Sequence, residues 1–112
     1  MSQITTHVLD TMHGTPANGV PVVLYQQTDI AWKEIGSGYT NPDGRVNNLL
    51  TPDLIVPPGI YKLKFEVDVY LQLLVDDYFF PAIEIMFRVK DNKHYHIPVL
   101  LNAFGYTTYR GS

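Results

Sequence analysis

The chain of 112 residues has no cysteine, which excludes a disulfide framework, a thiol nucleophile and any metal site with thiolate ligands. It also has no excess of basic residues: the formal net charge is −3, while the charged content of 17% is normal for a globular protein. Binding to nucleic acid needs a basic face for the phosphates, so this balance argues against a nucleic-acid partner. No apolar run approaches the roughly 18 residues of a membrane helix, so we expect no membrane partner either.

What the sequence does contain is typical of one globular domain. Hydrophobic residues make up 46% of it, and a chain of this length is long enough for one core and too short for two. We therefore expect a single domain over residues 1–112. The opening residues MSQITTH do not form a signal peptide, so the expected location is the cytoplasm.

Short segments with strand periodicity alternate with turn residues along the chain. Strands are predicted over residues 4–10, 20–27, 31–40, 46–50, 60–67, 82–90 and 94–101. The segment 68–75 (DVYLQLLV) predicts a short helix with Asp68 as its N-cap, and 91–93 (DNK) predicts a hairpin turn. This succession indicates an all-β fold: an antiparallel β-sandwich of two sheets, of immunoglobulin-like size, with one short helix.

Alternation within the strands assigns side chains to the core. The inward residues are expected to include Tyr61, Leu63, Phe65 and Val67, and further along the chain Ile83, Ile85, Phe87 and Val89. The glycines in 36–38 (GSG) interrupt their strand, which indicates a bulge or a close approach of another backbone. Residues 106–109 continue as extended chain without an evident partner, so we expect a sheet edge to mediate oligomerisation.

The C-terminal segment 94–112 (HYHIPVLLNAFGYTTYRGS) carries an unusual set of side chains for a strand and its tail. Period-two alternation puts His94 and His96 on one face, while the other face is uniformly apolar and is predicted to belong to the core. A purely structural strand does not need titratable groups on its second face. The segment therefore indicates a functional site, to which other parts of the chain must contribute.

His7 and Arg45 are the two other candidates for that site. His7 lies in the middle of the first predicted strand, where a lone histidine is more often a hydrogen-bonded structural residue than a functional one. Arg45 directly follows the tight turn 41–44 (NPDG), whose stiff backbone suits the guanidinium to bind an anion or a carbonyl. A solvated arginine beside a turn explains that position at least as well when it is considered alone. His13 lies among turn residues, and we assign it no role.

The histidines also permit a metal site as an alternative. His94, His96 and His7 together would supply the three imidazoles of a zinc site that activates water for hydrolysis. Two histidines two residues apart on a strand are weak support for a metal, and no carboxylate is placed as an evident partner for their rings. We therefore expect no metal and no cofactor.

Three separated motifs resemble the transthyretin-like family. They are ITTHVLD at the start, TNPDGRV in the middle and the C-terminal segment, and GTPANGVPV, LLTPD and FFPAIEI match in register between them. The resemblance is specifically to the enzyme branch of the family, the 5-hydroxyisourate hydrolases, which end in Tyr-Arg-Gly-Ser. Transthyretin itself lacks that tetrapeptide, so the tail favours the enzyme over the hormone carrier.

The resemblance implies a two-sheet sandwich that dimerises edge to edge and forms a homotetramer, with active sites at the dimer–dimer interface. It implies that 5-hydroxyisourate is the substrate and that its ring is opened to 2-oxo-4-hydroxy-4-carboxy-5-ureidoimidazoline in urate degradation, without a metal. The family motifs put the catalytic groups at His7, Arg45, His96 and Ser112, and they put Tyr109 beside the substrate together with His7 and Arg45.

Ring opening of an amide-like bond needs a base for water and a group that stabilises the developing oxyanion. Our hypothesis is that His7 and His96 orient and deprotonate the water, while Arg45 neutralises the developing charge. Tyr109 would position the heterocycle, and the hydroxyl or carboxylate of Ser112 would hold a histidine in place. His94 is left as a supporting residue. The non-enzymatic alternative is a transthyretin-like binding protein that holds a small apolar ligand without turnover.

Overall fold

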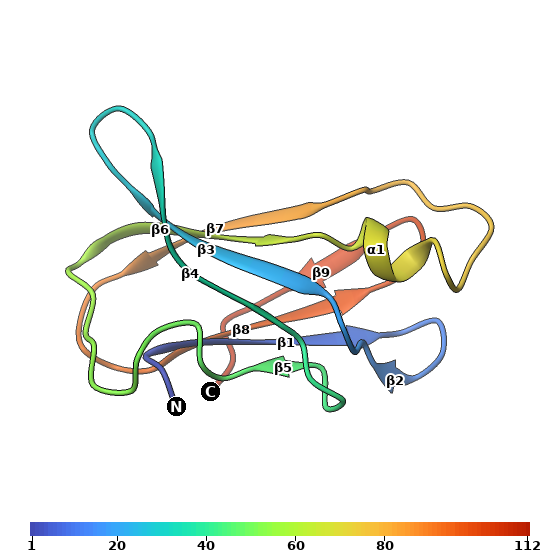
Figure 1. Cartoon of the computed structure of the whole chain (residues 1–112), viewed down its shortest axis with the longest axis horizontal. Coiled ribbons are helices and arrows are strands. Elements are labelled where there is room, and N and C mark those ends of the chain that lie inside the picture. Colours follow the sequence, from blue (N-terminus) through green and yellow to red (C-terminus); the bar gives the residue numbers. More distant parts are fainter.

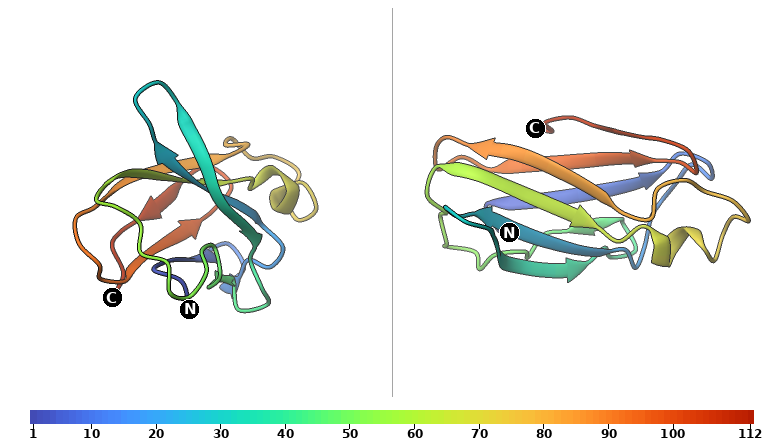
Figure 2. Two further views of the ribbon diagram at one scale, coloured as in Figure 1. Left: turned by 60° about the vertical axis from the view of Figure 1, so that its left-hand side comes forward. Right: turned by 90° about the horizontal axis from the view of Figure 1, so that it is seen from above.

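The computed structural model describes residues 1–112 and consists of two sheets that face each other (Figures 1 and 2). The first sheet has the order β2-β1-β8-β9, and a short β5 also pairs with β1. The second sheet has the order β4-β3-β6-β7. A short helix, α1 (Asp68–Leu71), follows β6, and no helix of the chain is long and apolar enough to cross a membrane. The predicted all-β sandwich of two sheets with one short helix is confirmed.

The strands of the first sheet are β1 (Ile4–Asp10), β2 (Thr15–Pro16), β5 (Arg45–Val46), β8 (Tyr95–Leu101) and β9 (Tyr106–Thr108). Those of the second sheet are β3 (Pro21–Gln27), β4 (Trp32–Tyr39), β6 (Gly59–Phe65) and β7 (Ile83–Val89). All neighbouring strands are antiparallel except β1 and β8, which run parallel with Ile4 opposite Tyr95. This pair corrects the expectation of a wholly antiparallel sandwich, and it joins the two ends of the sequence.

The core lies between the sheets and contains 21 buried apolar residues. The largest fully buried side chains include Tyr61, Leu63 and Phe65 of β6, and Ile83 and Val89 of β7 are also buried. Strand alternation assigned these residues to the interior, since successive side chains of a strand point to opposite faces. It also assigned Ile85 and Phe87 there, but these two are only partly buried and pack against the core. Burial of each such large apolar side chain contributes about 1.5–3 kcal/mol.

The predicted strand over 46–50 is wrong beyond Val46, because the chain leaves the sheet there and becomes a loop. Leu49 and Leu50 are nevertheless buried, so a loop fills part of the core with the apolar residues that suggested a strand. The loop crosses directly over Gly36, where an added Cβ would lie 2.1 Å from the carbonyl oxygen of Leu49. The bulge or close backbone approach predicted for 36–38 is therefore confirmed in both forms, because the β3–β4 register also shifts between Leu24 and Tyr25, opposite Gly36 and Glu34.

The helix is shorter than predicted, and Asp68 is not its N-cap. It spans Asp68–Leu71, its N-cap is Val67, and no side chain caps it. The Asp68 carboxylate instead accepts a hydrogen bond from the hydroxyl of Tyr78 in the loop that follows. The apolar residues Leu73 and Leu74 do not extend the helix and are exposed.

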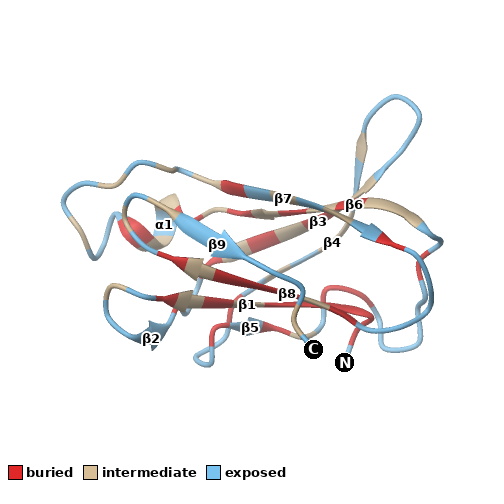
Figure 3. Cartoon of the chain, turned by 180° about the vertical axis from the view of Figure 1, so that it is seen from behind, coloured by how far each residue is buried: buried red, intermediate tan, exposed pale blue.

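Two expectations about the end of the chain are also corrected. The segment 91–93 is not a hairpin turn, because β7 and β8 belong to different sheets and the chain crosses between them there. Residues 106–108 are not unpaired, because β9 pairs antiparallel with β8, with Thr108 opposite Val99. Figure 3 shows that β9 is exposed along its length while most of β8 and β1 beside it is buried. β9 is therefore the free edge strand at one end of the first sheet, and β7 is the free edge strand at one end of the second sheet.

Candidate functional site

Strand pairing brings the predicted site residues together on the outer face of the first sheet. In the parallel pair β1–β8, Thr5 lies opposite His96 and His7 lies opposite Pro98. On the other edge of β1, the short strand β5 puts Arg45 opposite His7. Ile4, Thr6 and Val8 of β1 are fully buried and point to the core. The alternate residues Thr5 and His7 therefore point outward, toward Arg45 and His96.

The C-terminal tail returns to β8 after β9 and lies against His96. The backbone N–H of Gly111 donates a hydrogen bond of 2.8 Å to the carbonyl oxygen of His96. A Cβ at Gly111 would lie 2.7 Å from Cδ2 of His96 and 3.1 Å from Cγ of Pro98, so only glycine lets the tail come this close. On the other side of the tail, the guanidinium of Arg110 lies 4.3 Å from the centre of the Tyr95 ring. These contacts hold Tyr109 and Ser112 beside the histidines.

The resulting outer-face pocket has a volume of about 360 Å³ and is lined mainly by polar groups. It contains all five residues predicted for the site: His7, Arg45, His96, Tyr109 and Ser112. Thr5 and His94 also line it. Residues from the first strand, a central turn and the last residues of the chain thus converge on one pocket.

The histidine rings face this pocket without touching one another. The ring centres of His7 and His96 are 6.3 Å apart, and those of His94 and His96 are 6.1 Å apart. Thr5 lies between the last two rings: its Oγ1 is 2.8 Å from Nε2 of His94 and 2.7 Å from Nδ1 of His96. The sequence analysis missed Thr5 as a site residue. Its place on the same strand face as His7 was the one signal available.

The environment lowers the pKa of His7 and of His96. Partial burial lowers the pKa of His7, the positive charge of Arg45 lowers it further, and the nearby Asp43 opposes this in part. Burial also lowers the pKa of His96, and the charges of Arg45, His94 and His7 act in the same direction. A neutral imidazole has a lone pair available, as a general base requires. The two rings are therefore suited to accept a proton at neutral pH.

The geometry gives little support to a zinc site at these histidines. The chain has no group of three or more His, Cys, Asp or Glu side chains arranged to hold a metal ion. Nε2 of His94 and Nδ1 of His96 both face the hydroxyl of Thr5 rather than a common point in the pocket. His13, to which we assigned no role, lies apart from the site and bonds through Nδ1 to the carboxylate of Asp10 at 2.7 Å.

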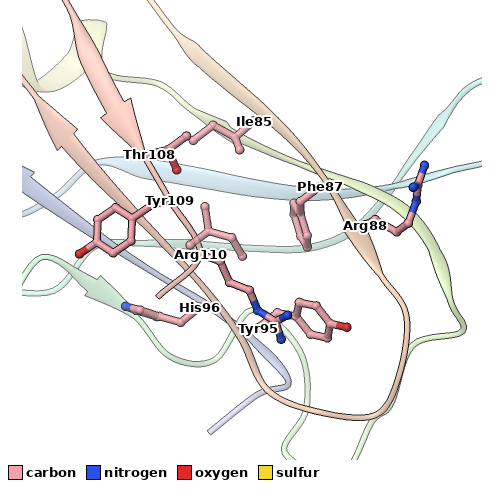
Figure 4. Close-up of a pocket in the computed structure, with 9 residues that line it drawn as sticks. Ile85, Phe87, Arg88, Tyr95, His96, Thr108, Tyr109 and Arg110 are labelled. Carbon is pink, nitrogen blue, oxygen red and sulfur yellow. The ribbon is translucent and has the colours of Figure 1, made fainter. Parts of the chain in front are cut away.

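A second pocket lies between the free edges of β7 and β9 (Figure 4). This edge pocket has a volume of about 270 Å³ and a mainly apolar lining that includes Ile85, Phe87 and Tyr95. Arg110 points into it, whereas His96 and Tyr109 line both pockets. The tail therefore forms a wall between a polar pocket on the sheet face and an apolar pocket at the sheet edges.

Comparison with known proteins shows the family of the chain. Residues 4–111 match the HIUase/Transthyretin family. The chain is 43% identical over 110 residues to a 5-hydroxyisourate hydrolase of Salmonella dublin, covering 97% of this chain and 80% of the relative. It is also 43% identical over 114 residues to a 5-hydroxyisourate hydrolase of Mus musculus, covering 99% and 96% of the two chains.

Solved structures of the same family have a similar fold. Transthyretin from Sparus aurata superposes with a TM-score of 0.90 at 29% identity, covering 99% of this chain and 97% of that one. The 5-hydroxyisourate hydrolase of Klebsiella pneumoniae superposes with a TM-score of 0.83 at 33% identity, covering 97% and 98%. With its sequence matched almost end to end and its fold reproduced, the chain belongs to the HIUase/Transthyretin family.

Proposed function

We propose that the protein hydrolyses 5-hydroxyisourate, opening its ring to 2-oxo-4-hydroxy-4-carboxy-5-ureidoimidazoline in urate degradation. The observation that carries the proposal is the convergence of His7, Arg45, His96 and the C-terminal segment 109–112 on one polar pocket. Relatives named 5-hydroxyisourate hydrolase, 43% identical over nearly the whole chain, support the choice of substrate.

In this proposal, His7 and His96 supply the base. Their lowered pKa values leave both rings uncharged, so either can take a proton from the attacking water while the other holds that water by a hydrogen bond. The ring centres, 6.3 Å apart, leave space between the rings for a water molecule or a polar atom of the substrate. Removal of the proton makes the water nucleophilic enough to attack the carbonyl.

Arg45 lies beside these rings and carries the charge of the site. Its guanidinium has five N–H donors in a planar fork, which matches an anionic heterocycle and the oxyanion that forms on its carbonyl. The same charge lowers the pKa of both histidines. Arg45 therefore has two effects in the proposal: it stabilises the transition state, and it keeps the bases unprotonated.

The tail completes the proposed site from the other side. Tyr109 is 56% exposed, so most of its ring is free to contact a flat heterocycle. Ser112 follows Gly111, whose backbone is bonded to His96, and its hydroxyl is available to hold a histidine ring. Loss of the tail should therefore impair turnover and not only binding.

We further propose that the protein is a homotetramer with its active sites at the dimer–dimer interface. The unpaired edges of β7 and β9 support edge-to-edge pairing of two copies, because such edges present free backbone donors and acceptors. The outer-face pocket is open, and a second dimer facing it would close a channel around the substrate. Light scattering coupled to size exclusion measures the assembly, and cell fractionation tests the proposed cytoplasmic location.

A transthyretin-like binding protein without turnover is the second candidate. The similarity to transthyretins supports it, including a sea bream structure in complex with thyroxine at a TM-score of 0.89 and 30% identity. The polar lining of the outer-face pocket disagrees with an apolar ligand there. Absence of turnover with retained ligand binding would favour this candidate.

The deciding experiment is a spectroscopic assay of freshly generated 5-hydroxyisourate with and without the protein. We expect the protein to accelerate its decay; decay at the spontaneous rate would refute the proposal. The variants His7→Asn, Arg45→Gln and His96→Asn then test the assignment of residues, and each should lose at least about 100-fold in rate. His13→Gln is the matched control, since this histidine lies outside the pocket. Near-normal rates in all three variants would overturn the assignment.

A further inference from the structure

The hydroxyl of Thr5 connects two histidines that the proposed chemistry uses unequally. It lies 2.7 Å from Nδ1 of His96 and 2.8 Å from Nε2 of His94, and Thr5 itself is only 1% exposed. His96 is partly buried in the pocket, whereas His94 is exposed to solvent. A continuous chain of hydrogen bonds therefore runs from the interior of the site to its rim.

A hydroxyl has one proton to donate, and the two rings are the hydrogen-bond partners of this buried hydroxyl. Its proton is therefore directed to one ring, and the hydroxyl oxygen accepts from the other. In the first arrangement, His96 donates through Nδ1–H to Thr5, and Thr5 donates to Nε2 of His94. In the second, His94 donates through Nε2–H to Thr5, and Thr5 donates to Nδ1 of His96. A neutral imidazole carries its proton on one nitrogen only, so each arrangement sets the tautomer of both rings at once.

The two arrangements give His96 opposite functions toward the pocket. In the first, the protons of both rings are on Nδ1, so Nε2 of His96 has a free lone pair and acts as a base. In the second, the protons of both rings are on Nε2, so His96 presents an N–H to the pocket and acts as an acid. Hydrolysis of an amide-like bond needs both functions in turn: a base for the water and an acid for the leaving nitrogen.

We propose that Thr5 and His94 form a proton relay through which His96 alternates between base and acid while its own ring stays neutral. The proposal rests on the proposed hydrolytic function. Thr5 and His94 act through His96 and touch no reacting atom, so they are positioning residues. No other residue is needed for the relay.

The forward transfer balances as follows. Nε2 of His96 takes a proton from water as the hydroxide bonds to the carbonyl carbon. The Nδ1 proton of His96 passes to Oγ1 of Thr5, and the Thr5 hydroxyl proton passes to Nε2 of His94. His94 then releases its Nδ1 proton to bulk water. One proton has entered at His96 and one has left at His94, which leaves the second arrangement.

The return transfer restores the first arrangement. Nε2–H of His96 gives its proton to the leaving nitrogen as the carbon–nitrogen bond breaks. Thr5 passes its proton to Nδ1 of His96 and receives the Nε2 proton of His94, which regains a proton at Nδ1 from solvent. The net reaction consumes only the water that is added across the bond.

The electrostatics of the site explain why such a relay is useful. A positive charge on His96 is disfavoured by its burial and by Arg45, as its lowered pKa indicates. Without the relay, His96 would have to hold the abstracted proton as an imidazolium beside this guanidinium. With the relay, the charge passes to His94, which is exposed and therefore better solvated.

The first test uses Thr5→Val, which keeps the side-chain shape and removes the hydroxyl, with Thr5→Ser as the matched control. For Thr5→Val we expect kcat to fall by about 10- to 100-fold, which is less than the full contribution of general acid–base catalysis. We expect KM to stay within about threefold of the wild-type value. For Thr5→Ser we expect kcat within about threefold, because the hydroxyl is retained. Equal kcat in Thr5→Val and the wild type, or equal losses in the two variants, would overturn the relay.

The second test uses His94→Ala, whose exposed position makes misfolding less of a concern. We expect kcat to fall by about tenfold and free imidazole in the buffer to restore it, since imidazole can accept the proton from Thr5 in place of the missing ring. Thr5→Val should not respond to imidazole, because the connection itself is broken. Loss of activity in His94→Ala without rescue by imidazole would contradict the relay.

A third test needs no substrate. Nitrogen-15 NMR of labelled histidine in the wild-type protein should show the proton on the same nitrogen in His94 and His96, Nδ1 in both or Nε2 in both. Opposite tautomers in the two rings would overturn the relay even if the enzyme is active. Conversely, failure of the wild type to accelerate 5-hydroxyisourate decay would refute the proposed function, which keeps the two failures distinguishable.

Discussion

Replacement of Gly111 by alanine should displace the chain terminus from His96. The new Cβ would lie 2.7 Å from Cδ2 of His96 and 3.1 and 3.3 Å from Cγ and Cδ of Pro98. Carbon atoms in contact are normally about 3.5 Å apart or more, so the ring or the tail must move by about 0.8 Å. Pro98 lies within a paired strand and cannot yield, which leaves the His96 ring and the tail to shift.

A displacement of about 1 Å in a positioned catalytic group can cost up to about 100-fold in rate, so we expect Gly111→Ala to lose about 10- to 100-fold in kcat/KM. The hydrogen bond from Gly111 to His96, 2.8 Å long, would also weaken, at about 0.5–1.5 kcal/mol. Because the tail lies outside the core, the melting temperature should change by only a few degrees. The result would be a folded protein with an impaired site.

The measurements are initial rates of 5-hydroxyisourate decay and a thermal unfolding curve for each variant. Gly105→Ala is the matched control, because its nearest neighbour to an added Cβ is Oδ1 of Asn102 at 3.8 Å, an ordinary contact. This control should retain its rate within about twofold. The argument from the tail's close approach fails if Gly111→Ala keeps full activity, or if the two glycine variants lose the same amount.

Three further predictions concern the pH dependence of activity, the effect of metal removal and the hydrogen bond between Tyr70 and Asp10. Burial and Arg45 hold the pKa values of His7 and His96 below the usual 6.5, so activity should be lost only as pH falls below that value and protonates the bases. In Arg45→Gln the residual activity should be lost at higher pH, because removal of the positive charge raises both pKa values; an unmoved pH–rate profile contradicts this. Treatment with EDTA should leave kcat unchanged, and a loss restored by Zn²⁺ would revive the zinc alternative. Tyr70→Phe should destabilise the fold by about 1–3 kcal/mol in urea unfolding, since the Tyr70 hydroxyl donates a 2.7 Å hydrogen bond to the buried carboxylate of Asp10. Activity of folded Tyr70→Phe should match the wild type.

The parts of the fold that could be predicted from sequence are those determined by local periodicity. The strand around Leu63 and Phe65 alternates cleanly, and both side chains are fully buried as predicted. Prediction failed where distant parts of the chain decide the outcome. Leu49 and Leu50 look like strand residues, but they fill the core from a loop. Asp68 looks like a helix cap, but Tyr78 engages its carboxylate.

Only part of the site could be predicted from local sequence patterns. Local patterns indicated that His96 and its tail are unusual, but nothing local joins them to His7 or Arg45; only the resemblance to a family brought these residues together. The structure brings all of them to the outer-face pocket. Thr5 was missed because threonine is common in strands and its partners are 89 and 91 residues away. A hydrogen-bond partner of this kind becomes visible only once the register of β1 and β8 is known.

The parallel pairing of β1 with β8 has a consequence for biosynthesis. Thr5 and His96 are separated by 91 residues, so the ribosome synthesises the first half of the pocket long before the second. Until β8 is made, one edge of β1 has no partner strand, and the nascent chain exposes an edge that can pair with other chains. Closing so large a loop is also slow compared with forming a hairpin. Turnover by this protein would therefore report that β8 has been translated and has paired with β1.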